Sequence, residues 1–187
     1  MAKPLVLISS RSFSTGNLDL NKILIDSGCE IRKISNTHDL AEISTDLKEA
    51  VAWIAGVAPI TSEMLDLAPN LKIISRYGVG VDSVDLSAAK NHGVLVANTP
   101  GANSNAVAEL ALSLIFSAAR NILVSDLNVR SDNWTAIPGR EINGMVVGVI
   151  GYGKIGRLVA SKLKLLGAKV LVSDPYVSDP AIVDLSL

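Results

Sequence analysis

The residues best suited to chemistry in this chain are three glycines and an aspartate. Gly151, Gly153 and Gly156 form a G-x-G-x-x-G pattern, and Asp174 follows the first of them by 174 − 151 = 23 positions. The pattern alone is weak evidence, but an acid about 20 residues after it is typical of a dinucleotide-binding site. The glycines would permit a tight turn close to a pyrophosphate, and Asp174 would bind the adenosine ribose.

The elements around these residues predict the strand, turn, helix and strand that such a site needs. Residues 145–150 are an apolar run typical of a strand buried on both faces of a parallel sheet. Apolar residues then recur at helical spacing up to Gly167, and residues 169–173 form the next strand. Because Asp174 would repel a 2′-phosphate, we expect NAD rather than NADP. The alternative is an ordinary βαβ unit with incidental glycines.

The composition is ample for a hydrophobic core and gives no support to several classes of partner. The chain has 187 residues, 49% of them hydrophobic, and a formal net charge of −1. This charge gives no support to nucleic acid or a membrane surface as a partner, and no apolar run is long enough to span a bilayer. The single cysteine, Cys29, cannot form an internal disulfide, which favours a reducing, cytoplasmic location.

Residues 1–99 alternate strand-like and helix-like patterns. This alternation with short links predicts one doubly wound domain with a parallel sheet. The expected strands are 5–8, 30–34, 51–56, 71–75 and 94–97, and the expected helices are 18–28, 40–50, 61–67 and 84–91.

A Pro-Gly pair at residues 100–101 predicts a domain boundary, so residues 100–187 form the second predicted domain. A long helix is expected over 103–121, followed by a polar, irregular arm over 124–143. The apolar stripe of that helix is predicted at Val107, Leu110, Ala111, Leu114, Ile115 and Ala118.

Three segments in this order, residues 71–82, 96–109 and 151–156, resemble the NAD-dependent D-2-hydroxyacid dehydrogenases, and among them most closely the phosphoglycerate dehydrogenases. The resemblance implies a flavodoxin-like substrate-binding domain followed by the first part of a Rossmann NAD-binding domain. It also implies hydride transfer between NAD and the CH–OH group of a D-2-hydroxy acid or its 2-oxo form.

By the same resemblance, the backbone amides of Gly78, Val79 and Gly80 would bind the substrate carboxylate, and Val79 would also contact the nicotinamide. Arg76 and Asn103 are candidates to hold the substrate. The alternatives are a surface ion pair for Arg76 and a plain helix cap for Asn103.

Lys154 and Ile155 would contact the pyrophosphate in that family. The long helix and the arm would form a homodimer, with Trp134 either anchoring the arm or packing in a local core. No metal is expected.

The chain also departs from the family pattern. The loop after the third strand, residues 56–61, lacks the arginine that phosphoglycerate-specific members place there. The catalytic arginine, carboxylate and histidine are expected beyond Leu187, so this chain alone is predicted to be inactive. His38 and His92 are expected to be structural or surface residues.

Two other functions stay open on the sequence. One is a non-catalytic NAD-sensing module similar to transcriptional co-repressors, and the other is a general dinucleotide-binding protein.

Overall fold

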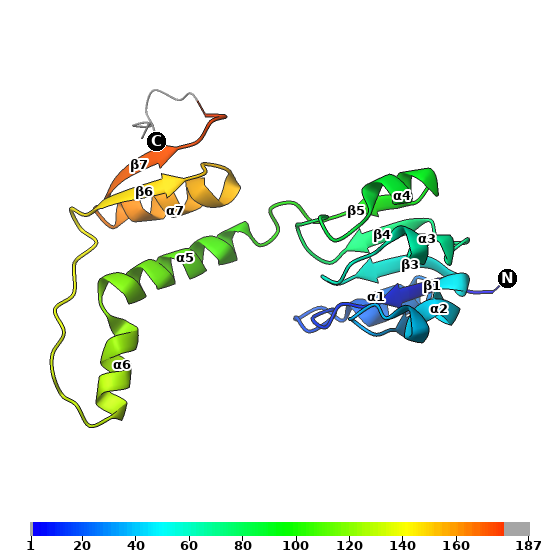
Figure 1. The fold of residues 1–187 in the computed structure, drawn as a ribbon, viewed down its shortest axis with the longest axis horizontal. Coiled ribbons are helices and arrows are strands. Elements are labelled where there is room, and N and C mark those ends of the chain that lie inside the picture. Colours follow the sequence, from blue (N-terminus) through cyan, green and yellow to red (C-terminus); the bar gives the residue numbers. More distant parts are fainter. Residues whose placement is uncertain (1, 178–187) are drawn as a thin grey trace. The chain divides into compact units, whose positions relative to one another are not determined.

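The computed structural model describes residues 2–177 and consists of two compact α/β units, which we describe separately (Figure 1). The first unit is Met1–Ala102 and the second is Asn103–Leu187. The sequence pattern placed the boundary between residues 99 and 100. Residues 178–187, which belong to the second predicted domain, lie outside the described part.

The first unit is built on a five-stranded parallel sheet with the order β2-β1-β3-β4-β5. The strands are β1 (Leu5–Ile8), β2 (Glu30–Lys33), β3 (Ala50–Ala55), β4 (Ile73–Arg76) and β5 (Leu95–Ala97). This is the flavodoxin-like order, which confirms the predicted fold class. The chain order reverses between β1 and β3, where doubly wound folds bind ligands at the carboxyl edge of the sheet.

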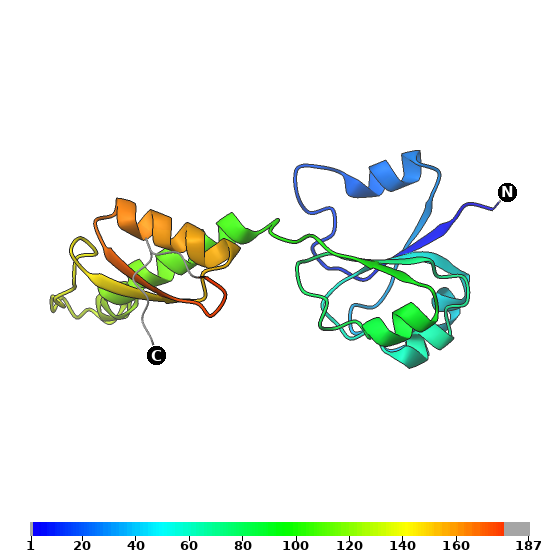
Figure 2. The ribbon, with the colours of Figure 1, turned by 90° about the horizontal axis from the view of Figure 1, so that it is seen from above.

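Four helices connect these strands: α1 (Leu20–Asp26), α2 (Leu40–Glu49), α3 (Ser62–Asp66) and α4 (Leu86–Asn91). Asp19, Asp39 and Asp85 cap three of them by accepting a bond from a first-turn N–H. Figure 2 shows α1 on the opposite face of the sheet from α3 and α4. The core gathers around the fully buried residues Leu7, Ile43, Leu47, Trp53, Leu65 and Ile74, whereas α1 buries no residue.

A buried polar network crosses the first unit between β1 and β3. His38 Nδ1 lies 2.8 Å from the Pro59 carbonyl, and its Nε2 lies 2.7 Å from Ser9 Oγ. Ser9 Oγ also accepts bonds from Trp53 Nε1 at 3.0 Å and from the Gly56 amide at 3.3 Å. Because a carbonyl only accepts, Nδ1 carries a proton. Ser9 Oγ already accepts two bonds, so its hydroxyl donates to Nε2. The imidazole is therefore neutral, and burial lowers the pKa of His38.

The second unit contains α5 (Ser104–Ala119), α6 (Ile122–Arg130), β6 (Val146–Ile150), α7 (Lys154–Leu165) and β7 (Lys169–Ser173). The strands β6 and β7 pair in parallel. The core of this unit is formed by Ala108, Ile142, Val159, Leu163 and Ala168. Gly167 follows α7 with φ +82°, so it ends the helix as predicted.

The predicted strand over 145–150 is present, but it is not buried on both faces. Its residues alternate in exposure, and the Ile150 side chain is 78% exposed. The reason is that Val147 packs toward the core shared with α5 and α7, and no described element covers the other face.

The apolar stripe predicted for the long helix is also partly wrong. Leu110 and Leu114 are exposed, while Ala108 and Leu112 lie at the core. The helix is apolar almost all round, so periodicity could not select a face. The small Ala108 side chain suits the close packing of α5 on α7.

The predicted irregular arm begins too early, because residues 122–130 form α6. Asn121 adopts the left-handed conformation with φ 52° and separates α5 from α6. No single helix among residues 2–177 has the length and apolar character to cross a bilayer; α5 and α6 meet that composition only together, and they are bent by 61°.

The neutral His38 predicts a pH dependence of stability in the first unit. The unfolded chain takes up a proton near the ordinary histidine pKa of about 6.5, but the folded chain resists it. The contribution of His38 to the free energy of unfolding is therefore full above about pH 6.5 and decreases as the pH falls below this value. Urea unfolding of wild type and His38→Asn between about pH 8 and about pH 5 measures this, since Asn tolerates the left-handed φ of 58°.

His92→Gln is the matched control because it removes the other histidine. We expect the free energy of unfolding to depend less on pH in His38→Asn than in wild type or His92→Gln. Equal slopes in all three proteins would show that His38 does not resist protonation.

Candidate functional site

The glycine turn in the second unit has the geometry that a phosphate-binding turn needs. Gly151 has φ +89°, a conformation that side chains rarely adopt. A Cβ on Gly156 would overlap the Gly151 carbonyl, so only glycine lets α7 approach β6 this closely. A Cβ on Gly153 would meet no atom within 4 Å. The turn is thus closed on the protein side and open beside Gly153, where a ligand can approach.

Asp174 lies beside this turn at the end of β7. Its Oδ2 accepts a bond from the Tyr152 amide at 2.6 Å, and its Oδ1 accepts one from the Tyr176 amide at 2.8 Å. The Tyr152 bond is the main cause that holds the Asp174 pKa below its ordinary value, with the Tyr176 bond and the Arg157 charge contributing. The carboxylate is therefore ionised at neutral pH and placed next to the glycine turn, as a ribose-binding acid requires.

The amino end of α7 completes the second-unit site. Gly153 occupies the N-cap position and no side chain caps the helix there. Lys154 and Ile155 form the first turn, and the Arg157 guanidinium lies 4.6 Å from the centre of the Tyr152 ring. The positive helix end and the nearby cations favour an anion such as a pyrophosphate.

In the first unit, Arg76 is buried and binds backbone carbonyls rather than lying at the surface. Its side chain is 7% exposed at the end of β4. Nε donates to the Gly80 carbonyl at 2.9 Å, and Nη1 donates to the carbonyls of Ala55, at 2.9 Å, and Gly56. The alternative of a surface ion pair is therefore wrong, and the guanidinium joins the ends of β3 and β4 to the loop that follows.

That loop has its carbonyls bound and two amides free. The Thr99 amide and hydroxyl both donate to the Gly78 carbonyl at 3.0 Å, and Asn98 Nδ2 donates to the Val79 carbonyl at 2.6 Å. Together with the arginine bond to Gly80, these contacts hold all three carbonyls. The amides of Val79 and Gly80 donate to no partner within residues 2–177. Adjacent free amides at the carboxyl edge of a sheet form a concavity for an anion.

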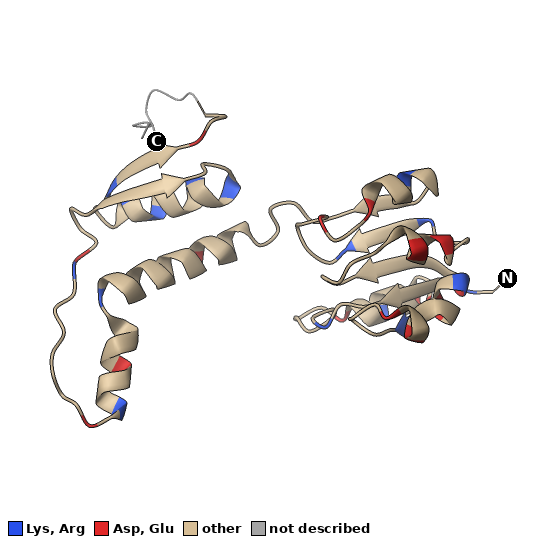
Figure 3. Cartoon of the chain, viewed as in Figure 1, with Lys and Arg blue, Asp and Glu red and all other residues tan. Residues whose placement is uncertain are grey.

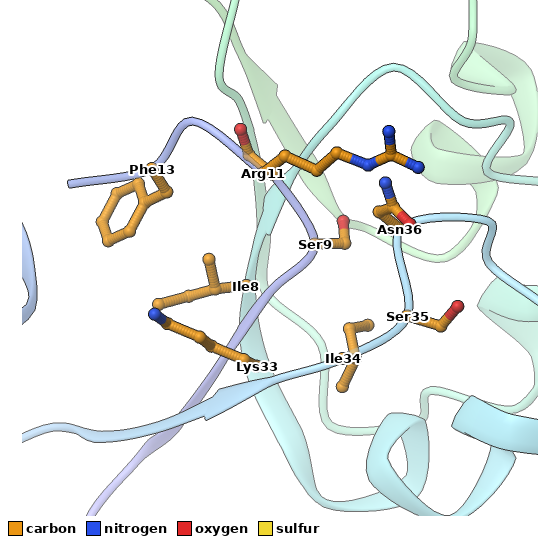
Figure 4. Close-up of a pocket in the computed structure, with 9 residues that line it drawn as sticks. Ile8, Ser9, Arg11, Phe13, Lys33, Ile34, Ser35 and Asn36 are labelled. Atoms are coloured by element: carbon orange, nitrogen blue, oxygen red, sulfur yellow. The ribbon is translucent and has the colours of Figure 1, made fainter. Parts of the chain in front are cut away.

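The sheet edge beside this loop contains cavities that the sequence patterns did not predict. One has a volume of about 340 Å³ and is lined by Ser9, Ser10, Arg11, Ser12, Asn36, Gly56, Val57 and Tyr77. A second, of about 280 Å³, shares Ser9, Ser10, Arg11 and Asn36 and continues toward β2 (Figure 4). A Cβ on Gly56 would lie 2.7 Å from the Ser9 carbonyl, so β1 and β3 meet closely at the point where the strand order reverses.

A usable sequence signal for these cavities existed. Arg11 and Asn36 each follow a predicted strand by a few residues, and the ends of parallel strands share one edge. Asn98 and Thr99 belong to the segment 96–109 that resembles the family, but the sequence does not indicate that they hold the loop carbonyls.

The remaining predicted residues occupy less informative positions. Asn103 is at the N-cap of α5, but its side chain makes no capping bond. His92 follows α4, and its Nε2 lies 3.0 Å from Asp66 Oδ1. Because the chain after α4 enters the amino end of β5, His92 lies near the sheet edge opposite the one that carries Gly78. Within residues 2–177 no group of three or more His, Cys, Asp and Glu side chains could hold a metal.

Comparison with known proteins places this geometry in a family. Residues 6–178 match the model of the D-isomer-specific 2-hydroxyacid dehydrogenase catalytic domain. A D-3-phosphoglycerate dehydrogenase of Mycobacterium bovis is 42% identical over 136 residues, covering 72% of this chain and 26% of the relative. A hydroxypyruvate reductase of Thermotoga maritima is 37% identical over 127 residues, covering 67% of this chain and 42% of the relative.

Solved structures agree with this assignment. The TT0316 protein of Thermus thermophilus superimposes with a TM-score of 0.87 at 30% identity, covering 97% of this chain and 60% of that one. An NAD⁺-bound 3-phosphoglycerate dehydrogenase of Entamoeba histolytica gives 0.76 at 25% identity, covering 98% and 58%. The chain thus spans only part of the length of these relatives. By its family match and its fold, it belongs to the D-isomer-specific 2-hydroxyacid dehydrogenases.

Proposed function

We propose that this chain is part of an NAD-dependent oxidoreductase that transfers hydride between NAD and a D-2-hydroxy acid or its 2-oxo form. The observation that carries the proposal is the loop after β4. Its carbonyls are held by Arg76, Asn98 and Thr99, which leaves the amides of Val79 and Gly80 free for a carboxylate. Every 2-hydroxy acid has such a carboxylate next to the carbon that reacts.

The second unit supplies the cofactor site in this proposal. The open space beside Gly153 and the amino end of α7 suit the pyrophosphate, with Lys154 and Ile155 in its first turn. Asp174 would accept bonds from the ribose hydroxyls. The bound nicotinamide supplies the hydride acceptor or donor. The protein's part is to hold the substrate carboxylate and orient the carbon that reacts.

Proton transfer needs a group that the two histidines do not provide. His38 uses both ring nitrogens inside a buried network, and His92 lies at the opposite sheet edge. We therefore place the acid–base group outside residues 2–177. No described feature favours the NAD-sensing module, which would need the same cofactor site but not the free amides. A cytoplasmic location remains part of the proposal.

The proposed assembly is a homodimer through the second unit. Figure 3 shows α5 and α6 with few charged residues. Leu110, Leu114, Leu123 and Leu127 are exposed along them, and Trp134 in the following arm is 83% exposed. Within residues 2–177, Trp134 therefore packs in no local core. Large apolar side chains left in water on two consecutive helices are typical of a subunit interface.

The cofactor prediction concerns Asp174. An ionised carboxylate at the ribose would oppose the charge of a 2′-phosphate, so NAD should bind at least about tenfold more tightly than NADP. Calorimetric titration with both dinucleotides measures this difference. Asp174→Asn should reduce the preference for NAD, whereas Asp132→Asn, an exposed acid of the same unit, should leave it unchanged. Equal affinity for both dinucleotides in the wild type would contradict the prediction.

The catalytic prediction concerns the loop amides. Asn98→Asp removes a donor from the Val79 carbonyl and adds a negative charge beside the proposed carboxylate site. In the natural form of the protein, assayed by NADH absorbance with 2-oxo acids, we expect KM to increase by about tenfold or more. Asn70→Asp is the control because Asn70 Nδ2 also donates to a carbonyl, that of Lys48. An unchanged KM in Asn98→Asp would contradict the proposed role of the loop in substrate binding.

The dimer prediction concerns the exposed apolar residues. Light scattering at micromolar concentration should give twice the monomer mass. The double change Leu114→Glu with Leu123→Glu should give the monomer mass, because a charge buried at an interface is costly. Leu95→Glu, at an exposed position in the first unit, is the control. A wild-type protein that stays monomeric would refute the assembly.

A further inference from the structure

Arg11 is a cation without a counter-charge at the reversal point of the first sheet. It follows β1, and its side chain is exposed and lines both cavities described above. No carboxylate within residues 2–177 forms an ion pair with it. Arg32 in the same unit is the contrast, because it pairs with Glu30, Asp46 and Glu49.

The Arg11 guanidinium is held in place by a neutral group. When the Asn36 amide is oriented so that its oxygen faces Arg11, that oxygen accepts from Nη2 at 2.9 Å and also from Nε. Figure 4 shows the two side chains pointing toward each other, with Lys33 on the other side of Ile8 and Ser9. Asn36 orients the guanidinium without neutralising it, so its full charge and its Nη1 donors remain available.

The cavities around Arg11 are suited to an anion. Neither is lined by an aspartate or a glutamate. Ser10 and Ser12 place hydroxyl groups beside the arginine, with Ser10 Oγ 3.5 Å from Ser12 Oγ. Val57 and Tyr77 supply the apolar wall of the larger cavity. A volume of about 340 Å³ lies within the range of small-ligand sites.

The larger of the two cavities that Arg11 lines also adjoins the loop with the free amides, because Tyr77 lines it. Phe13 is buried and packs edge-on against Tyr77, with 5.5 Å between ring centres. Tyr77 directly precedes Gly78, the first residue of the loop with the free amides. The contact between Phe13 and Tyr77 therefore holds the turn after β1 against that loop.

We propose that Arg11, oriented by Asn36, binds a second acidic group at the far end of the substrate, and so selects 2-hydroxy acids that carry a phosphate or a second carboxylate. This inference rests on the proposed function, because it assumes that the first carboxylate binds the Val79 and Gly80 amides. Arg11 is then a specificity-determining residue, and an arginine in the 56–61 loop is not required for an acidic substrate.

The test uses two matched pairs of acids that differ in the far group. The pairs are 3-phosphoglycerate with D-glycerate, and D-malate with D-lactate, with affinities measured by calorimetry on the natural protein in saturating NADH, so that the hydroxy acids are not oxidised during the titration. We expect the acidic member to bind about tenfold or more tightly in at least one pair. Preference within the first pair only identifies a phosphate, and preference within the second only identifies a carboxylate.

Arg11→Gln should abolish the preference and leave the affinity for D-glycerate and D-lactate unchanged. Lys3→Gln is the control because it removes the same charge before the amino end of β1. Binding of all four acids with equal affinity would overturn the inference alone, as would an equal loss for both members of a pair in Arg11→Gln. Failure of all four acids to bind would overturn the proposed function together with the inference.

Discussion

The proposed substrate site depends on one buried guanidinium. Arg76 donates to carbonyls of β3, of the residue after it and of the loop after β4, and no carboxylate within residues 2–177 neutralises it. Hydrogen bonds from a charged donor contribute about 1.5–3 kcal/mol each, so the loop is held firmly. With its carbonyls turned toward Arg76, Asn98 and Thr99, the loop has its amides free. The charge also reaches the adjacent network, where it lowers the His38 pKa further.

The proposed cofactor site in the second unit uses the opposite polarity. There the Asp174 carboxylate accepts hydrogen bonds from the Tyr152 amide in the glycine turn and from the Tyr176 amide after β7. The bond from the Tyr152 amide fixes the distance between the Asp174 carboxylate and the glycine turn. In both units, then, an ionised side chain orients backbone groups at the carboxyl edge of a parallel sheet, where such folds bind ligands.

Much of this could be predicted from the sequence, because the signals were local. The alternation over residues 1–99 predicted the parallel sheet, and the glycine spacing with Asp174 predicted the turn beside an acid. Features that depend on tertiary packing were missed. The buried face of α5 could not be chosen, since Leu110 and Ala108 are both apolar, and the Asn121 break that starts α6 depends on one left-handed residue. The cavity at Arg11 forms where turns distant in sequence meet, so it could be inferred only by combining the predicted parallel sheet with the polar residues after its strands.

NMR can observe the two free amides of Val79 and Gly80 themselves. In a backbone-assigned NMR spectrum, D-lactate is titrated into the protein at a saturating NADH concentration, so that it is not oxidised. We expect the Val79 and Gly80 amide protons to shift strongly downfield on binding, as donors to a carboxylate do. The Gly78 amide, which already donates to the Arg76 carbonyl at 2.8 Å, should change little. Saturable binding of D-lactate that leaves the Val79 and Gly80 amide shifts unchanged would contradict this expectation.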